Sequence, residues 1–299
     1  MKNKATVFVI SAGILWGIIS LFIKPLSSIG FSAIQISFLR SALSFILFFI
    51  YLLLTDRKKL KFKFSDIWMF IGTGIISLSL FNLCYFYAII NGQASIAVVL
   101  LYTSPVFIML LSAILFKERI TATKLLALVL TLGGCVAVSG VLGGNLNFGA
   151  AVIIAGVASG FFYGLYTIFS KYALAKYSSE TVTVYTFLLS ALSMLPFCNI
   201  TKAADLIATK PTSILLIVAA AFFSTVLPYL LYTKSLTSLD SGKAAILVAI
   251  EPLVGAVVGT VFFREALGLA KAAGIIMVLS AIIILSCRNE KRSERYDGK

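Results

Sequence analysis

Ten long runs of apolar residues, separated by short polar breaks, dominate the chain. A helix that crosses a bilayer needs about 20 predominantly apolar residues. The breaks carry residues typical of loops, namely Lys24-Pro25, Asn91-Gly92, Gly143-Gly144-Asn145, Lys210-Pro211 and Asp240-Ser241-Gly242. The pattern predicts an all-α integral membrane protein with spanning helices at 5–24, 33–54, 66–90, 94–116, 123–141, 149–171, 181–199, 212–234, 242–263 and 270–287.

Composition supports the membrane interpretation. Of the 299 residues, 60% are hydrophobic and only 12% are charged, which is about half the charged share of soluble proteins. A water-soluble domain of this composition would expose a large apolar surface. The N-terminal Met1–Lys4 and the apolar run behind it imitate a signal peptide. We expect that segment to be retained as a helix, because the internal repeat described below needs it.

The net charge of +14 does not indicate a nucleic-acid partner, because the basic residues lie in short connections rather than on one face. If the N-terminus is cytoplasmic, 19 Lys and Arg residues fall on the cytoplasmic side and five on the other side; Arg40, inside a helix, belongs to neither. Positively charged connections stay in the cytoplasm. The sequence therefore predicts a multi-pass plasma-membrane protein with both termini cytoplasmic.

Several chemistries are excluded by residue type. The chain has no histidine, so histidine triads and histidine metal sites are ruled out. Its four cysteines, Cys84, Cys135, Cys198 and Cys287, show no CxxC spacing. No G-x-x-x-x-G-K-[ST] loop is present, so ATP does not drive the protein directly. We expect no cofactor and no bound metal.

An internal repeat appears when the sequence is shifted by 147 positions. Both copies keep a small-xxx-small motif near their start and a proline followed 13 residues later by a glutamate. The coinciding pairs are Gly13 with Gly160, Trp16 with Tyr163, Gly17 with Gly164, Lys24 with Lys171, Tyr85 with Tyr232, Pro105 with Pro252, Glu118 with Glu265, and Lys124 with Lys271. Each copy holds five predicted helices. An odd number reverses the chain direction, so the two repeats are expected to be inverted, as in many transporters.

The predicted organisation is therefore a first repeat at 5–142, a second at 149–287 and a polar tail at 288–299, expected to be disordered. The chain resembles the EamA group of ten-helix permeases in the drug/metabolite transporter superfamily. The resemblance rests on Leu15-Trp16-Gly17, Phe38-Leu39-Arg40, Pro105 with Phe116-Lys117-Glu118-Arg119, and Glu251-Pro252 with Phe263-Arg264-Glu265. It implies a plasma-membrane carrier, often an exporter of amino acids or other metabolites, but identifies no substrate.

Glu251 is the only acidic residue deep inside a predicted helix. A carboxylate at that depth needs a partner or a water-filled cavity. Two interpretations stand: a substrate or proton site, or a structural ion pair, for which Arg40 at similar depth is the candidate partner. Tyrosine and tryptophan at mid-depth suit an aromatic-lined cavity for apolar or cationic solutes. The candidate substrate-binding residues are Trp16, Arg40, Asn82, Tyr85, Tyr102, Tyr163, Tyr229 and Glu251.

The function that this pattern favours is a secondary transporter, most simply an exporter, of a small metabolite such as an amino acid or amine, working by alternating access. The expected partners are that solute and the lipid bilayer; the sequence does not define an oligomeric state. An integral membrane enzyme would need a cluster of catalytic groups, and a channel usually presents rings of like groups. Both remain alternatives.

Overall fold

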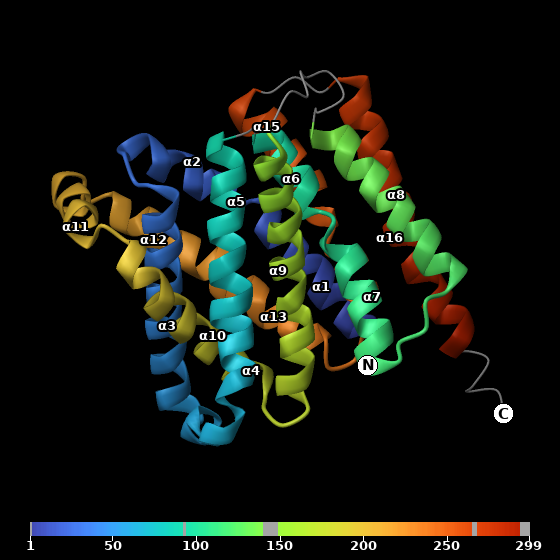
Figure 1. Cartoon of the computed structure of the whole chain (residues 1–299), viewed down its shortest axis with the longest axis horizontal. Helices are drawn as coiled ribbons and strands as arrows, with labels where there is room; N and C mark the ends of the chain where they lie inside the picture. Colours follow the sequence, from blue (N-terminus) through green and yellow to red (C-terminus); the bar gives the residue numbers. More distant parts are fainter. Residues whose placement is uncertain (1, 92–93, 140–148, 265–267, 294–299) are drawn as a thin grey trace.

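The computed structural model describes residues 2–91, 94–139, 149–264 and 268–293 (Figure 1). This part of the chain is helical and contains no β-strand. Ten of its helical stretches are long and apolar enough to cross a membrane: Asn3–Ile29, Ala33–Thr55, Phe64–Asn91, Ala97–Phe116, Ala122–Ser139, Ala150–Leu174, Ser179–Phe197, Ser213–Ser235, Ser241–Phe263 and Leu269–Ser286. The predicted all-α fold with ten spans is confirmed. Gly92 and the Gly143-Gly144-Asn145 break lie outside the described residues.

Five of the ten spans each consist of two helices. The helices are α1 (Lys2–Gly17) and α2 (Ser20–Ile29) in the first span, α3 (Ala33–Thr55) in the second, α4 (Ile67–Ile71) and α5 (Leu80–Asn91) in the third, α6 (Ala94–Leu101) and α7 (Ser104–Phe116) in the fourth, and α8 (Ala122–Ser139) in the fifth. They continue with α9 (Ala150–Leu174), α10 (Ser179–Met194), α12 (Ser213–Ala221) with α13 (Leu227–Ser235), α14 (Ser241–Leu247) with α15 (Ile250–Phe263), and α16 (Leu269–Ser293). A short helix, α11 (Ile200–Thr209), connects α10 to α12.

Two predicted boundaries were wrong. Lys24-Pro25 lies inside α2 rather than in a loop. A proline disturbs the turn before it, and the chain breaks at Ile18 and Ile19 instead. The last helix runs to Ser293, six residues past its predicted end, so the polar tail is not disordered from 288. A helix that is already formed extends easily through good helix formers such as Arg288 and Glu290.

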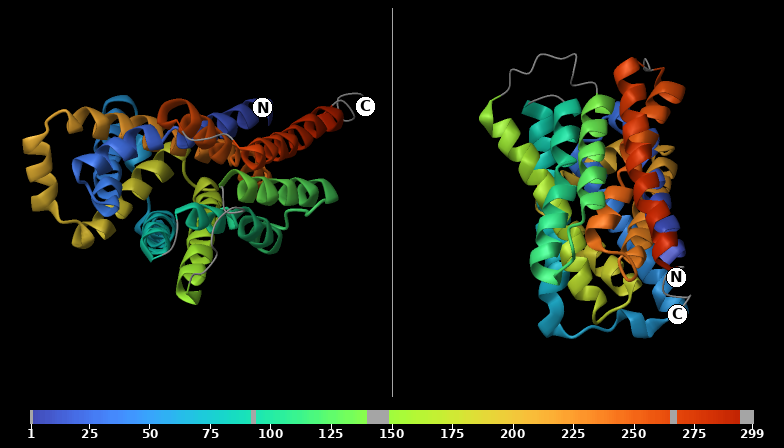
Figure 2. Two further views of the ribbon diagram at one scale, coloured as in Figure 1. Left: turned by 90° about the horizontal axis from the view of Figure 1, so that it is seen from above. Right: turned by 90° about the vertical axis from the view of Figure 1, so that its right-hand side faces the viewer.

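Both chain ends lie at the same face of the helical bundle (Figure 2). We call it the terminal face and define it by Lys2 and the connections 56–63, 117–121, 175–178 and 236–240. The opposite face, called the far face, carries the connections 30–32 and 198–212, and the second of these connections contains α11 (Figure 1). An even number of spans requires this arrangement of the ends.

The two halves contact each other reciprocally. In the first half, α1 packs against α13 and α15; its counterpart α9 packs against α5 and α7. The second spans, α3 and α10, pack against each other, and so do the fifth spans, α8 and α16 (Figure 1). Contacts in which i meets j and j meets i are the signature of two-fold symmetry. Because each half has five spans, this structure is an inverted repeat with an axis in the membrane plane.

Local backbone geometry follows the same symmetry. The fourth and ninth spans both end in a non-glycine residue with left-handed conformation, Lys117 at φ 54° and Arg264 at φ 55°. These positions are 147 residues apart. The third and eighth spans both contain a π-helical segment, Gly72–Ser79 and Phe222–Val226. Left-handed residues other than glycine are uncommon, so their pairing at this offset is strong evidence for one duplicated unit.

Candidate functional site

A pocket of about 280 Å³ lies where α1, α2, α5, α6 and α15 meet. Its wall contains four of the candidate residues, three that provide aromatic surface and one that carries a carboxyl group. They are Trp16, Tyr85, Tyr102 and Glu251. The pocket is also lined by Gly17, Ile19, Ser20, Lys24, Val98, Leu101, Pro252, Gly255 and Gly259. The structure thus brings together residues that are far apart in the chain, such as Trp16 and Glu251, which are 235 positions apart.

Breaks in two spans give the pocket its polar character. The fourth span is interrupted at Tyr102 and Thr103, and the ninth at Val248 and Ala249. Each break is followed by a proline, Pro105 or Pro252, which removes one helical hydrogen bond. Unwound backbone within a membrane is tolerated where it lines a cavity, and it marks binding sites in many transporters.

Glu251 stands in the first turn of α15, directly after the break. The N-terminal turn of a helix carries a partial positive charge that favours a carboxylate. Tyr102, from the break in the other span, lines the same pocket as Glu251. Both breaks therefore place a polar side chain at the pocket wall, and the acidic one can bind a cation or a proton.

Trp16 connects the pocket to a buried aromatic layer that contains Tyr229 and Tyr232. Its ring centre lies 5.0 Å from that of Tyr229, in an edge-on arrangement, and 5.6 Å from that of Tyr232. Edge-to-face rings at this separation attract one another. Tyr232 is further fixed by a 2.8 Å hydrogen bond between its hydroxyl and that of Thr167. The layer holds the Trp16 ring in place as a rigid pocket wall.

Glycines bring the wall helices close enough to form the pocket. A Cβ atom on Gly13 would lie 2.7 Å from the Val248 carbonyl oxygen, and one on Gly17 would lie 2.7 Å from the Glu251 carbonyl oxygen. The repeat counterparts behave alike: Gly160 approaches the carbonyl oxygen of Leu100 to 2.9 Å by the same measure. Each GxxxG motif thus seats the first helix of one half on the broken helix of the other.

The other four candidate residues do not line this pocket. Arg40 donates from Nε to the Thr225 hydroxyl at 2.9 Å and from Nη2 to the Ser224 carbonyl oxygen at 3.0 Å. Those acceptors belong to the π-helical segment of the eighth span, and within the described chain Arg40 forms no ion pair with Glu251. Of the two interpretations of Glu251, the ion pair with Arg40 is therefore not formed among the described residues. The distorted segment leaves a carbonyl group that Arg40 satisfies.

Asn82, Tyr163 and Tyr229 are likewise held by their neighbours. Asn82 donates from Nδ2 to the Leu78 carbonyl oxygen of its own helix at 2.7 Å. The Tyr163 ring packs edge-on against Phe81 with centres 5.3 Å apart. Tyr229 stands behind Trp16, in the aromatic layer.

Sequence reasoning missed Lys24 as a pocket residue, because the Lys24-Pro25 pair was interpreted as a loop. Its Nζ atom lies 3.7 Å from the centre of the Phe263 ring, which is the geometry of a cation–π contact. The pocket therefore carries groups of both charges, Glu251 and Lys24. The signal was present in the repeat, where Lys24 coincides with Lys171. No cluster of potential metal ligands occurs among the described residues.

Comparison with known proteins agrees with this architecture. The model of the EamA-like transporter family matches residues 3–140 and 150–287. The chain belongs to this family. It is similar to two uncharacterized transporters of Archaeoglobus fulgidus: one is 30% identical over 95% of this chain and 96% of its own length, and the other is 28% identical over 90% and 94%.

More distant EamA-family relatives and solved structures extend the match. An uncharacterized transporter of Bacillus subtilis, YxxF, is 22% identical over 98% of this chain and 92% of its own. A crystal structure with 19% sequence identity superposes with a TM-score of 0.79 and covers 97% of this chain and 99% of that one. At that identity the superposition shows the fold alone. The family and the relatives identify the chain as a multi-pass membrane transporter.

Proposed function

We propose that the protein moves a small solute across the plasma membrane by alternating access, and that the pocket around Glu251 binds this solute. The observation that carries the proposal is the position of Glu251. It is an acidic side chain in the first turn of a broken helix, on the wall of a pocket shared by both halves. Alternating access needs one central site that two related halves can open in turn.

The lining of the pocket favours a solute with a protonated amine. A carboxylate attracts the amine, while the faces of Trp16 and the rings of Tyr85 and Tyr102 suit a cation or an apolar group. Lys24 adds a positive charge in the same pocket, which is complementary to a carboxylate on the solute. An amino acid or a simple amine matches this lining, and we propose export as the direction.

The proposed orientation places the terminal face in the cytoplasm. The order of the spans along the sequence assigns 19 basic residues to the side of the chain ends and five to the other side. The connection 56–63 alone carries Arg57, Lys58, Lys59, Lys61 and Lys63. The excess follows the rule that positively charged connections remain in the cytoplasm.

Solute counterflow in proteoliposomes tests the function. A thermal-shift screen of amino acids and monoamines first selects the compound that stabilises the purified protein most, and this compound becomes the labelled probe. We expect saturable counterflow in the parent and at least a tenfold lower rate in Glu251→Gln. Asp205→Asn, the same change at an exposed site on α11, is the matched control. Non-saturable flux would support a channel, and product formation without flux would support an enzyme.

A further inference from the structure

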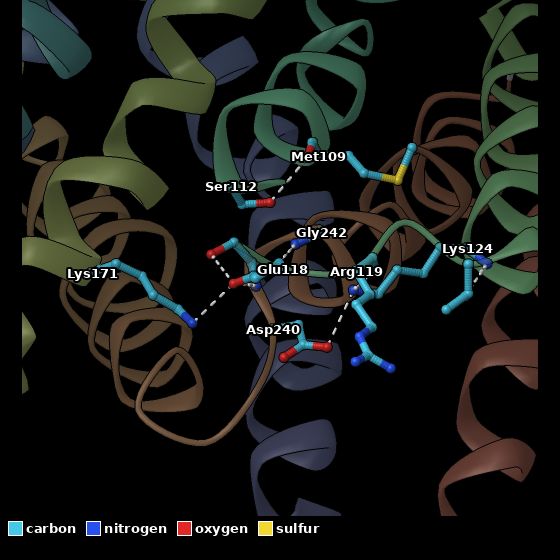
Figure 3. A network of polar contacts seen from close by, with 10 residues as sticks. Met109, Ser112, Glu118, Arg119, Lys124, Lys171, Asp240 and Gly242 are labelled. Carbon is cyan, nitrogen blue, oxygen red and sulfur yellow. Dashed lines mark hydrogen bonds and ion pairs between the residues drawn. The ribbon is translucent and has the colours of Figure 1, made fainter. Parts of the chain in front are cut away.

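A second polar centre, distinct from the pocket, lies at the terminal face around Glu118 (Figure 3). Glu118 follows the fourth span. Its Oε1 atom accepts hydrogen bonds from Lys171 Nζ at 3.1 Å, from the Ser241 backbone N–H at 2.9 Å and from the Ser241 hydroxyl at 3.0 Å. Its Oε2 atom accepts from the Gly242 N–H at 3.4 Å. One carboxylate therefore joins the ends of three spans.

The contact with Ser241 and Gly242 is a helix cap supplied from outside the helix. The first N–H groups of a helix lack internal partners and are usually capped by the preceding side chain. In α14 that residue is Asp240, whose side chain makes no capping hydrogen bond. Asp240 instead accepts from Lys124 Nζ at 3.2 Å. Glu118 from the opposite half supplies the cap, so the start of α14 is held only when the two halves are together at this face.

These contacts cross the boundary between the two halves. Glu118 and Lys124 belong to the first half, whereas Lys171, Asp240 and Ser241 belong to the second. Beneath them, a Cβ atom on Gly242 would lie 3.4 Å from Met109 Cγ, so α14 and α7 are also in van der Waals contact. The network closes the terminal-face end of the fourth and ninth spans, the same two spans whose breaks hold Tyr102 and Glu251.

The Glu118 carboxylate at the centre of this network is buried. The Glu118 side chain is 8% exposed, whereas in the neighbouring Lys59–Glu180 pair, also at the terminal face, the glutamate is 21% exposed. Burial by itself raises the pKa of Glu118, but the hydrogen bonds from Ser241 and the charge of Lys171 outweigh it and leave the pKa below its ordinary value. Glu118 is therefore ionised at neutral pH and remains a strong acceptor.

The internal symmetry shows that this position is built into the repeat. Lys171 Nζ lies 5.8 Å from the centre of the Phe116 ring. Lys24 and Phe263, the counterparts at the 147-residue offset, make the same kind of contact at the opposite end of the bundle. In both cases a lysine from the first span of one half reaches the end of the fourth span of the other. Glu265, the counterpart of Glu118, lies outside the described residues.

We propose that Glu118 is a latch: its bonds to Lys171 and to the first turn of α14 keep the terminal face shut, and the pocket becomes accessible from this face only when they separate. The purpose of the latch rests on the proposed function. The latch itself can be tested independently of that function, because opening of the terminal face is measurable without transport.

Thiol accessibility tests the latch. Cys84, Cys135, Cys198 and Cys287 are replaced by alanine, and a cysteine is placed at Ser112, which is 1% exposed and lies on α7 beneath the network. Inverted membrane vesicles expose the terminal face in the proposed orientation. We expect Glu118→Gln and Lys171→Gln each to raise the rate of reaction of Ser112→Cys with a charged methanethiosulfonate reagent at least fivefold. If Glu118→Gln does not fold, the labelling rate of Lys171→Gln tests the latch instead.

Glu180→Gln is the matched control, because Glu180 also pairs with a lysine of the other half, at 3.0 Å, but does not cap α14. It should leave the labelling rate unchanged. Rates equal to the parent in both latch variants, or an equal rise in the control, would overturn the proposal. Absence of counterflow in the parent would instead refute the proposed function and leave the labelling result intact.

Discussion

Gly17 lies directly against the backbone of Glu251. A Cβ atom added to Gly17 would stand 2.7 Å from the Glu251 carbonyl oxygen and 2.5 Å from Val254 Cβ. The glycine of the first helix therefore sets how closely the acidic residue of the ninth span approaches the pocket. The contact connects a packing motif that is visible in the sequence with the group that we propose binds the solute.

Gly17→Ala should displace α15 and impair the pocket. Contacts as short as 2.5 Å between carbons force the helices apart, and overpacking of this kind costs about 1–3 kcal/mol. We expect at least a tenfold lower counterflow rate with a reduced melting temperature. Gly149→Ala is the control, since nothing lies within 4 Å of an added Cβ there. Normal transport by Gly17→Ala would show that the close approach has no functional role.

Glu251→Gln should weaken binding of an amine solute with little loss of folded protein. The amide keeps the size of the side chain but removes the charge. Loss of one charge-assisted contact of about 1.5–3 kcal/mol corresponds to roughly a 10- to 100-fold weaker interaction. Isothermal titration with the probe selected by thermal shift measures it.

The same variant decides whether Glu251 carries protons. If it does, the counterflow rate of the parent depends on pH and that dependence becomes flat in Glu251→Gln. A pH profile that is identical in parent and variant would assign the titration to another group.

Arg40 should prove structural. Its guanidinium group satisfies the Ser224 carbonyl oxygen and the Thr225 hydroxyl in the distorted eighth span. Arg40→Met leaves these acceptors without a donor, and we expect a destabilisation of about 1–3 kcal/mol with unchanged affinity for the solute in the protein that remains folded. A loss of affinity without a loss of thermal stability would place Arg40 in the binding site after all.

The Glu118 network should stabilise the protein in a pH-dependent way. Because the folded-state pKa of Glu118 is lowered, its stabilisation is fully present above the ordinary glutamate pKa of about 4.5 and is lost as the pH falls through the folded-state pKa. We expect Glu118→Gln to melt several degrees lower than the parent at pH 7, and the difference to shrink below about pH 4.5. The charges facing Glu118 in this range are Lys171 on α9 and, nearby, Lys124 and Asp240. A constant difference down to pH 3 would contradict this account.

The orientation is tested by cysteine labelling in sealed cells. We expect an impermeant maleimide to reach a cysteine at Asn91, at the end of α5 towards the far face, and not one at Lys59 on the terminal face. Disruption of the cells should make Lys59→Cys reactive and serves as the control. Labelling at Lys59→Cys in intact cells would invert the topology.

The sequence by itself determined the number of spans, because twenty apolar residues can satisfy their backbone in lipid only as a helix. It also determined the inverted symmetry, since residues such as Gly17 and Gly164 keep their register over 147 positions and five spans reverse direction. Glu251 could also be identified from the sequence as a candidate site residue, because one carboxylate deep in an apolar helix requires a polar environment.

Only the tertiary structure decided which partners these residues have. Arg40 and Glu251 both lie deep in helices, and spacing along the chain cannot say which face of a helix meets which neighbour. Packing places Arg40 on the eighth span and Glu251 on the wall of the pocket that Tyr102 also lines. Lys24 entered the pocket because the first span continues through Pro25, an outcome that local turn signals do not predict. Glu118 reads as an ordinary charge at a helix end, and its role as the cap of α14 exists only because the folded halves bring it to Ser241 across 123 residues. The chemistry of a side chain is fixed by its residue type, whereas the groups that it contacts depend on how all the helices pack together.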